Sequence, residues 1–431
     1  MAALGLDFGT TNTVFATLDA SGAPCATLFA SGEGRQAAVR TALSFTAASK
    51  AGGGRGVEAG PWAIAAYLAA PEETRFLQSL KTYAASPHFS GATLFARRYA
   101  FEDLAELIVA RLRARADGAL DGLPARLVVG VPVAFAGAAP DAALARRRYG
   151  EAFGRFGFDD VRFVYEPVAA AFWFARRLER AATVLVADFG GGTTDYSLIR
   201  FEPARGGARA RPLAHAGVGV AGDQFDYRIV DRLVLPRLGK GSHYKSMGRT
   251  MEIPPSLFAN FARWNLLSTF RGSADHRMLL SLIRDALEPE KLALFAQLVE
   301  ENEGYALYQA VSRAKTQLSS QASARLRFHA HGIDIDAAFT RAEFEDWIAD
   351  DLARMEGALD AALARAGLAP GDVDRVFLTG GTSFTPAVRR IFTRRFGAAK
   401  IERGDELLSI AHGLALIGAR EDFAAWEAPA A

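Results

Sequence analysis

Residues 186–199 read VADFGGGTTDYSLI, and residues 4–16 read LGLDFGTTNTVFA, so the chain uses one pattern twice. Each stretch contains a short apolar run that ends in an aspartate, then a phenylalanine, glycine and threonines, and finally a second apolar run. Short apolar runs separated by glycine predict a β-hairpin rather than a helix. The repetition predicts a pseudo-symmetric protein with two similar lobes and a cleft between them.

The turn of each predicted hairpin has the composition of a phosphate-binding loop. Glycine lacks a Cβ, so backbone N–H groups can converge on an anion, and threonine hydroxyls can add further donors. Asp7 and Asp188 stand where each strand meets its turn, and carboxylates there can hold Mg²⁺ directly or through its water ligands. The turn residues that would contact phosphate are Gly9, Thr10, Thr11, Gly190, Gly191, Gly192 and Thr193.

Composition excludes several other classes of function. The chain has 431 residues, half of them hydrophobic, and its 50 Lys and Arg against 48 Asp and Glu give a net charge of +2. Such a charge gives no general attraction to nucleic acid or anionic lipid, so we expect neither as a partner. The single cysteine rules out an internal disulfide and a thiolate-rich metal site and favours a reducing compartment. We find no signal peptide and no apolar run of about 20 residues, and we expect a cytoplasmic protein without a membrane span.

Three further stretches are assigned to structural roles. The stretches ARRRY (residues 145–149) and VRRIFTRRF (residues 388–396) repeat arginine at helical spacing and are predicted to be solvated helix faces. GVGVAG, at residues 217–222, is interpreted as a strand end and turn before a helix rather than as a dinucleotide site. No G-x-x-x-x-G-K-[ST] motif occurs, which excludes a P-loop NTPase.

The two hairpin stretches, together with FLTGGTSFTP from Phe377, resemble the phosphate and adenosine signatures of the actin-like ATPase superfamily. Within it, LVVGVPVAF, VYEPVAAAF and AGDQFDYRIVD are similar to segments of the seventy-kilodalton heat-shock (DnaK-type) chaperones. The matches run in family order from residue 4 to about residue 420. The chain is most similar to the short, ATPase-domain-only, YegD-like branch of that family, and we expect no peptide-binding domain.

The resemblance implies the α/β actin-like ATPase fold, in which two RNase-H-like lobes with inserted subdomains flank a cleft that binds MgATP. We expect lobe I at residues 1–178, with a subdomain inserted near residues 32–104. Lobe II would occupy residues 179–431, with a helical insertion near residues 222–332 and a helix near its C-terminus. Within that insertion, LGKGSHYKSMGRTMEIPPS has the composition of a loop and is a candidate mobile segment or partner surface.

The resemblance also implies roles for individual residues around the phosphates. Asp7 and Asp188 would hold the hydrated Mg²⁺ and orient the attacking water. Lys81 would stabilise charge on the γ-phosphoryl group, although a surface lysine is the alternative. Glu166 would join the network of metal and water, and Thr193 would bond to the γ-phosphate. The implied cofactor-binding residues beyond the turns are Asn12, Asp195, Gly222, Lys315, Ser319, Gly380, Gly381, Thr382 and Phe384.

The adenine end of the site departs from the family pattern. In SRAKTQLS, Ser312 and Thr316 stand where the family has an acid and an arginine, while Lys315 and Ser319 are retained. Phe384 replaces a second arginine, and its ring could stack on adenine in place of the two planar cations. The sequence therefore leaves base selectivity open.

We consider three functions at this point. The first is an ATP-binding, slowly hydrolysing, Mg-dependent and chaperone-like ATPase in which MgATP controls lobe closure, with a protein partner or co-chaperone. The second is a nucleotide-gated interaction module with little or no hydrolysis, suggested by the altered adenine clamp. The third is a small-molecule kinase of the same superfold, for which we find no sugar-kinase signature.

Overall fold

The structure is a computed structural model of the chain. It describes residues 3–32, 34–47, 56–122, 124, 126–137, 139–158, 160–204, 207–263, 270–330, 332–402 and 407–429. The chain divides into two compact units, of which unit 1 contains Met1–Ala65, Gln78–Gly222 and Asp351–Ala431 and unit 2 contains Ala66–Leu77 and Asp223–Asp350. The lobe boundaries expected from the sequence stay predictions.

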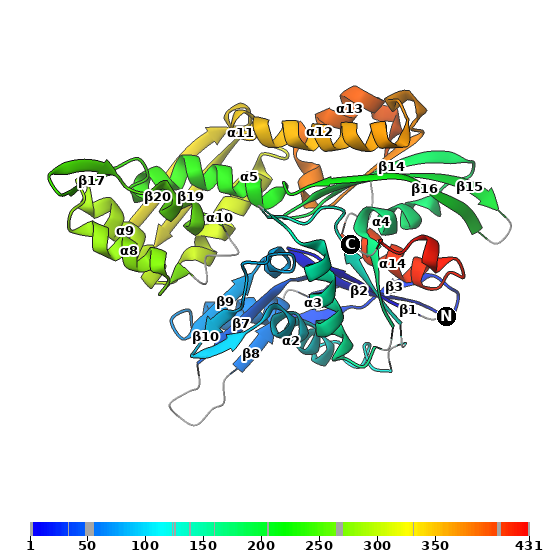
Figure 1. Cartoon of the computed structure of the whole chain (residues 1–431), viewed down its shortest axis with the longest axis horizontal. Helices are drawn as coiled ribbons and strands as arrows, with labels where there is room; N and C mark the ends of the chain where they lie inside the picture. Colours follow the sequence, from blue (N-terminus) through cyan, green and yellow to red (C-terminus); the bar gives the residue numbers. More distant parts are fainter. Residues whose placement is uncertain are drawn as a thin grey trace. The chain divides into compact units, whose positions relative to one another are not determined.

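The described residues contain both helices and strands, which gives the mixed α/β composition expected for the fold (Figure 1). The helices are α1 (Gly60–Ala69), α2 (Phe101–Ala114), α3 (Ala142–Gly154), α4 (Glu166–Ala175), α5 (Gly222–Ile229), α6 (Pro255–Phe261), α8 (Ala274–Ile283), α9 (Pro289–Glu300), α10 (Gly304–Gln317), α11 (Arg341–Trp347), α12 (Ala349–Ala366), α13 (Pro386–Phe396) and α14 (Ser409–Gly418). The short helices η1 (Leu80–Tyr83) and η5 (Gly381–Phe384) carry residues of the candidate site.

Unit 1 contains two sheets with the same order and direction of strands. The first sheet runs β3 (Pro24–Ala26), β2 (Asn12–Leu18), β1 (Ala3–Phe8), β12 (Arg126–Val131) and β13 (Asp160–Tyr165). The second runs β16 (Gly207–Val218), β15 (Thr194–Ala204), β14 (Ala182–Phe189), β21 (Arg375–Thr379) and β22 (Ile401–Glu402). In both sheets the first three strands pair antiparallel and the last two join in parallel. The repeated sequence therefore marks a repeated half-structure, and both predicted hairpins are confirmed.

Helix α4 is buried because it packs against strands of the second sheet on one side and against α14 on the other. The ring of Phe174 stacks on that of Phe377 in β21, with centroids 4.1 Å apart. Helix α14 also packs on β1 and β12, so it covers the first sheet. This is the helix expected near the C-terminus, and Figure 1 shows it beside α4.

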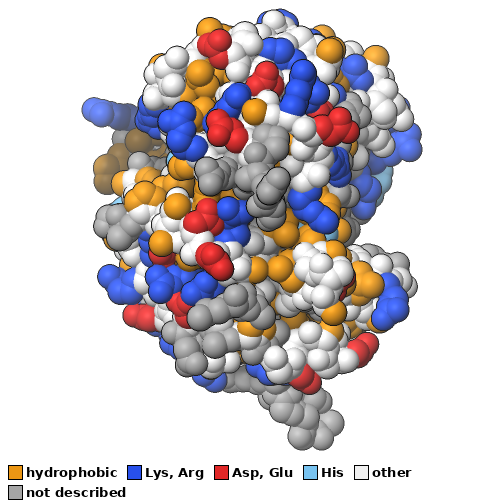
Figure 2. All heavy atoms as spheres, turned by 90° about the vertical axis from the view of Figure 1, so that its right-hand side faces the viewer, with side chains coloured by type: hydrophobic (Ala, Val, Ile, Leu, Met, Phe, Trp, Pro, Cys, Tyr) orange, Lys and Arg blue, Asp and Glu red, His pale blue; other side chains and the backbone are white. Residues whose placement is uncertain are grey.

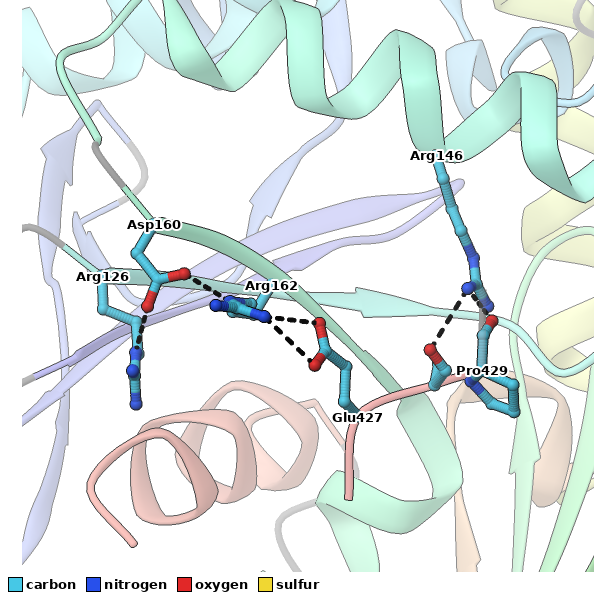
Figure 3. A network of polar contacts seen from close by, with 7 residues as sticks. Arg126, Arg146, Asp160, Arg162, Glu427 and Pro429 are labelled. Atoms are coloured by element: carbon cyan, nitrogen blue, oxygen red, sulfur yellow. Dashed lines mark hydrogen bonds and ion pairs between the residues drawn. The ribbon is translucent and has the colours of Figure 1, made fainter. Parts of the chain in front are cut away.

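The residues that follow α14 lie along the edge strand β13. The backbone N–H of Ala428 donates to the carbonyl of Phe163 at 2.8 Å, and Phe423 and Trp426 are buried. Figure 3 shows Arg162 reaching Glu427 from the same strand, where its Nη1 lies 3.3 Å from each carboxylate oxygen. The tail thus adds apolar and ionic contacts to this edge of unit 1.

Unit 2 is mainly helical among its described residues. The rings of Phe258, Phe261, Phe270 and Phe295 form an aromatic cluster among its helices. The strands β19 (Ser323–Ala330) and β20 (Ile333–Thr340) form a hairpin with alternating buried and exposed residues, as expected for a sheet with one solvated face. Helix α11 begins with a capping box, because Thr340 and Glu343 bond to each other's backbone N–H.

The stretch LGKGSHYKSMGRTMEIPPS, which the sequence suggested to be a loop, contains a β-hairpin. Strands β17 (His243–Ser246) and β18 (Arg249–Glu252) pair antiparallel across a two-residue turn. Met247 and Gly248 both have positive φ, which matches the twist of a tight hairpin. The sequence did not show this hairpin because a methionine stands where such turns favour asparagine or aspartate.

The remaining elements are short helical segments and short strands. The helical segments are η2 (Val230–Val234), η3 (Leu235–Leu238), η4 (Pro370–Asp372), η6 (Ala398–Lys400) and η7 (Phe423–Ala425). The strands are β4 (Phe29–Ser31), β5 (Gly34–Gln36), β6 (Val39–Arg40), β7 (Ala42–Thr46), β8 (Gly56–Ala59), β9 (Thr74–Gln78), β10 (Ala92–Leu94) and β11 (Arg97–Tyr99). Within the described residues, every helix is too short or too polar to cross a membrane. On the face drawn in Figure 2, acidic and basic side chains are interspersed, in keeping with the small net charge.

Candidate functional site

The two glycine turns of unit 1 have the same backbone hydrogen bond. The N–H of Gly9 donates to the carbonyl of Asn12, and that of Gly190 donates to the carbonyl of Thr193, both at 2.9 Å. The turns also lie next to each other, since a Cβ placed on Gly192 would be 3.6 Å from the hydroxyl of Thr10. The structure thus brings the two candidate phosphate-binding turns together.

Beside these turns lies a buried group of charged side chains. The ammonium of Lys81, in η1, forms an ion pair with the carboxylate of Glu166 at the start of α4, and the two side chains are only 6% and 5% exposed. Asp7 and Asp188, each at the end of a hairpin strand, are buried as well. The burial of Lys81 rules out the alternative interpretation of a surface lysine.

Burial and repulsion by neighbouring acids raise the pKa values of Asp7 and Asp188. Burial, with the charge of Glu166 adding to it, raises the pKa of Asp7 to about 7, although Lys81 opposes this shift. The pKa of Asp188 is raised well above its usual range by burial and then by Glu166, Asp195 and Asp7. Burial lowers the pKa of Lys81, but the nearby acids outweigh it and raise the pKa overall, so this side chain stays charged.

Asp195, which faces Asp188 across the second hairpin, ties that hairpin to the segment after β12. Its Oδ1 accepts the N–H groups of Val133 and Ala134 at 2.9 and 3.0 Å. Its Oδ2 is buried and has no hydrogen-bond partner among the described residues. Burial raises the pKa of Asp195 to about 7, with a further contribution from Glu166.

The donor set fits a hydrated magnesium ion better than a directly coordinated metal. Among the described residues, no three His, Cys, Asp or Glu side chains converge closely enough to bind one ion directly. Several buried carboxyl groups nevertheless lie near Lys81, and burial, with their mutual repulsion adding to it, raises the pKa values of Asp7, Asp188 and Asp195. Mg²⁺ keeps most of its water ligands and contacts proteins through one or two carboxylates, so Asp7 and Asp188 suit it.

The residues of the candidate adenosine motif in unit 1 adjoin the second hairpin. Gly380 has φ +82°, and a Cβ there would lie 2.1 Å from the carbonyl oxygen of Phe189, so no other residue fits. Thr382, in η5, donates from its hydroxyl to the carbonyl of Gly190 at 3.4 Å. Phe384, at the end of η5, leaves 44% of its surface exposed, and its ring is available to a base.

The candidate residues on α10 belong to unit 2. Lys315 pairs with Asp226 of α5, with Nζ and Oδ1 2.7 Å apart, and Ser319 follows the end of the helix. Thr316 donates its hydroxyl to the carbonyl of Ser312 at 2.9 Å, so it bonds to its own helix. Gly222 begins α5 as interpreted from GVGVAG, and its N–H points to the carbonyl of Gly190 at 3.5 Å.

The prediction that ARRRY is a solvated helix face is wrong for two of its arginines. Arg148 is buried in α3, where its guanidinium binds backbone carbonyls, and only Arg147 is fully exposed. Arg146 is half-buried and donates to the carbonyls of Ala428 and Pro429 (Figure 3). Helical spacing could not show this, because three consecutive arginines point in three directions around the helix.

The structure also places a residue beside the site that the sequence did not suggest. Tyr149 of α3 is fully buried among the rings of Phe8, Phe101 and Phe153, and its hydroxyl has no hydrogen-bond partner among the described residues. Burial raises its pKa, and this hydroxyl and the charge of Lys81 influence each other. A tyrosine among aromatic residues gives the same sequence signal as ordinary core, so no pattern could have selected it.

Two matching sheets, each with a glycine hairpin, are the features of the actin-like ATPase fold. A protein-family model described as Hsp70 protein matches residues 87–239 and 298–419, which is more than half of the chain. The chain therefore belongs to the Hsp70 family, as the sequence resemblance implied. Membership implies an ATP-binding, chaperone-like ATPase, of a family that typically binds ATP with Mg²⁺. Asp7 and Lys81 lie outside the matched residues, so their assignment depends on the geometry of the site.

Proposed function

We propose that this protein binds MgATP at the two glycine turns and hydrolyses it slowly, and that the bound nucleotide controls closure of the molecule around it. The proposal is carried by one observation, the buried group of Lys81, Glu166, Asp7 and Asp188 beside two turns that share one backbone geometry. Backbone N–H groups and hydroxyls would bind the phosphates, while the group of charges would act on the transferring phosphoryl group.

Each buried side chain has a distinct proposed role. Lys81 would neutralise charge that develops on the γ-phosphoryl oxygens, and Glu166 holds the ammonium in place through their ion pair. Asp7 and Asp188 would hold the hydrated Mg²⁺, which neutralises phosphate charge when it is bound. The same two carboxylates would orient the water that attacks the γ-phosphoryl group. Thr193 would bond to the γ-phosphate, and Asp195 keeps the second hairpin in register with the segment after β12.

The nucleoside would bind next to the second hairpin. Gly380 and Gly381 allow close approach of the backbone, and Thr382 adjoins the Gly190 carbonyl. The exposed ring of Phe384 would stack on the base, a contact worth about 1–3 kcal/mol. Lys315 and Ser319 belong to unit 2, and their part in binding the nucleoside stays a prediction from the sequence. A protein partner or co-chaperone that senses the nucleotide state is part of the same proposal.

A second candidate, a nucleotide-gated interaction module with little hydrolysis, is favoured by the altered adenine clamp. Thr316 stands where the family has an arginine, so this position has no planar cation to stack on a base. Its hydroxyl bonds instead to the carbonyl of Ser312 in its own helix. This difference weakens one side of the nucleoside site without touching the buried charges. The two candidates therefore predict similar binding but different release of phosphate.

The test is a single-turnover assay with Mg²⁺ and trace labelled ATP that follows bound nucleotide and released phosphate together. We expect the wild-type protein to release phosphate from bound ATP and Asp188→Asn to do so at least about 100-fold more slowly. Asp121→Asn is the matched control, because that side chain is 72% exposed and away from the site.

Undiminished phosphate release by a folded Asp188→Asn variant would remove Asp188 from the mechanism. Tight ATP binding by the wild-type protein without phosphate release would instead establish the second candidate. Thermal melting of all three proteins shows whether a lost rate reflects lost folding.

A further inference from the structure

Helix α3 holds the loop that follows Lys81. Nη1 of Arg148 donates to the carbonyls of Tyr83, Ala84 and Ser86 at 2.7, 3.0 and 3.1 Å. Nη2 donates to the carbonyl of Phe89 at 2.7 Å. Among the described residues, this guanidinium donates its hydrogen bonds to one loop, at residues 83–89. The loop begins at the last residue of η1.

The N-terminus of the same helix contacts the same loop. The backbone N–H of Asp141 donates to the carbonyl of Ala85 at 2.8 Å, while its side chain caps α3 by accepting the N–H of Leu144. The rings of Tyr83 and Phe89 stack with centroids 4.1 Å apart, which closes the loop. Helix α3 therefore binds the loop at five of its carbonyl groups.

Arg148 is an unusual residue in this place because it is buried. Only 9% of its surface is exposed, and its Nε lies 3.6 Å from the carboxylate of Glu102 in α2. A buried cation destabilises the folded state unless hydrogen bonds and an opposite charge compensate for its lost hydration. The four carbonyls and Glu102 supply that compensation, and the carbonyls come from the loop attached to Lys81.

The turn that carries Lys81 needs such support. Ser79, which precedes η1, has φ +54°, a left-handed conformation that is strained for a residue other than glycine. Its carbonyl accepts the N–H and the hydroxyl of Thr82 at 3.2 and 2.7 Å, so the turn is held at its start by its own residues. At its end it is held by Arg148.

We propose that Arg148 is a positioning residue for Lys81, because the carbonyls it binds fix the turn from which the Lys81 ammonium reaches Glu166. Any effect of Arg148 on catalysis rests on the proposed ATPase function. Its effect on the position of the Lys81 side chain does not. Arg148→Lys keeps the charge but loses the planar fork that binds several carbonyls at once.

The first test is kinetic. In single-turnover hydrolysis we expect Arg148→Lys to slow phosphate release about 10- to 100-fold, with ATP affinity changed less than about 3-fold, because a small misplacement of a catalytic group is costly. Arg155→Lys is the matched control, since Arg155 at the other end of α3 binds Asp103 and Glu106 on α2 and is partly exposed. We expect that control to behave as wild type.

A double-mutant cycle separates positioning from a general loss of stability. In the Lys81→Met background, Arg148→Lys should cause no further loss of rate, because its effect acts through Lys81. An equal further loss in that background would overturn the proposal. So would wild-type kinetics in Arg148→Lys itself.

The second test does not depend on hydrolysis. The rate at which the Lys81 amine is acylated is measured by mass spectrometry in the nucleotide-free wild type, Arg148→Lys and Arg155→Lys. We expect Lys81 to react at least about 10-fold faster in Arg148→Lys only, because the buried ion pair is no longer held in place. Equal reactivity in all three proteins would overturn the inference. If the wild-type protein had no ATPase activity, the proposed function would be wrong. The acylation rates of Lys81 would still test whether Arg148 positions Lys81.

Discussion

In the first glycine hairpin Asp7 faces Val14 across the strand pair, whereas in the second Asp188 faces another carboxyl group, that of Asp195. The backbones are alike, since both turns close with the same hydrogen bond at 2.9 Å. Their electrostatic surroundings differ. Burial is the main cause that raises the pKa of Asp7 to about 7. Burial also raises the pKa of Asp188, and the charges of several acidic neighbours raise it further. A duplicated backbone thus offers two aspartates at equivalent positions with different tendencies to be ionised.

The different charge around Asp7 and Asp188 predicts that they respond differently to a bound magnesium ion. Because Asp188 is surrounded by more negative charge, it gains more from a bound divalent cation than Asp7 does. Lys81 lies among the charges that favour ionisation of both groups. We therefore expect both aspartates to be needed for hydrolysis and the second to depend more strongly on magnesium.

The largest effect should come from neutralising the first aspartate. We expect Asp7→Asn to slow single-turnover phosphate release at least about 100-fold, comparable to Asp188→Asn, because each removes charge at the reacting phosphate. The Mg²⁺ concentration that gives half the maximal rate should rise in both variants. A folded Asp7→Asn protein that hydrolyses ATP at the wild-type rate would break the equivalence of the two hairpins.

A smaller effect should distinguish the turns by their packing. A Cβ on Gly9 would lie 2.5 Å from the carbonyl oxygen of Asn12, whereas one on Gly190 would lie 3.5 Å from that of Thr193. We expect Gly9→Ala to lower the free energy of unfolding by about 2 kcal/mol and Gly190→Ala by less than about 1 kcal/mol, because only the first is overpacked. Denaturant unfolding of the two variants measures this, and equal losses would contradict it.

The smallest effect concerns pH and the extra carboxyl group of the second hairpin. Burial raises the pKa of Asp195 from its usual 3.8 to about 7 in the folded protein, so the folded state holds a proton that the unfolded state releases. The protonated Asp195 side chain therefore favours the folded state below about pH 4, and this stabilisation is lost as the pH rises towards 7. In the metal-free protein, Asp195→Asn should therefore reduce the fall in Tm between pH 5 and pH 8.

We expect that reduction to be only about 1–2 °C, because the buried carboxyl groups share protons and one substitution removes part of the effect. Asp121→Asn, whose side chain is 72% exposed, serves as the control and should leave the pH dependence unchanged. A Tm profile of Asp195→Asn that parallels the wild type would show that Asp195 does not take up this proton.

The parts of the fold that could be predicted are those determined by near neighbours in the sequence. The hairpins at Asp7 and Asp188 follow from alternating apolar residues around a glycine turn, and the structure confirms both. The β17–β18 hairpin was missed because Met247 and Gly248 do not form a usual turn sequence. Strand β17 also bonds to a distant segment, because the N–H of Lys245 donates to the carbonyl of Asp285 and the N–H of Leu287 donates to that of His243.

The sequence by itself determined the two phosphate-type turns, the aspartates at their strand ends and membership of an ATPase class, because these depend on residues a few positions apart. Only the tertiary structure decided which charges meet. Lys81 and Glu166 are 85 residues apart in the chain, and Arg148 reaches a loop about 60 residues before it. Burial decides their roles, since a side chain withdrawn from water must find its partners within the fold, and the sequence does not state which side chains those are.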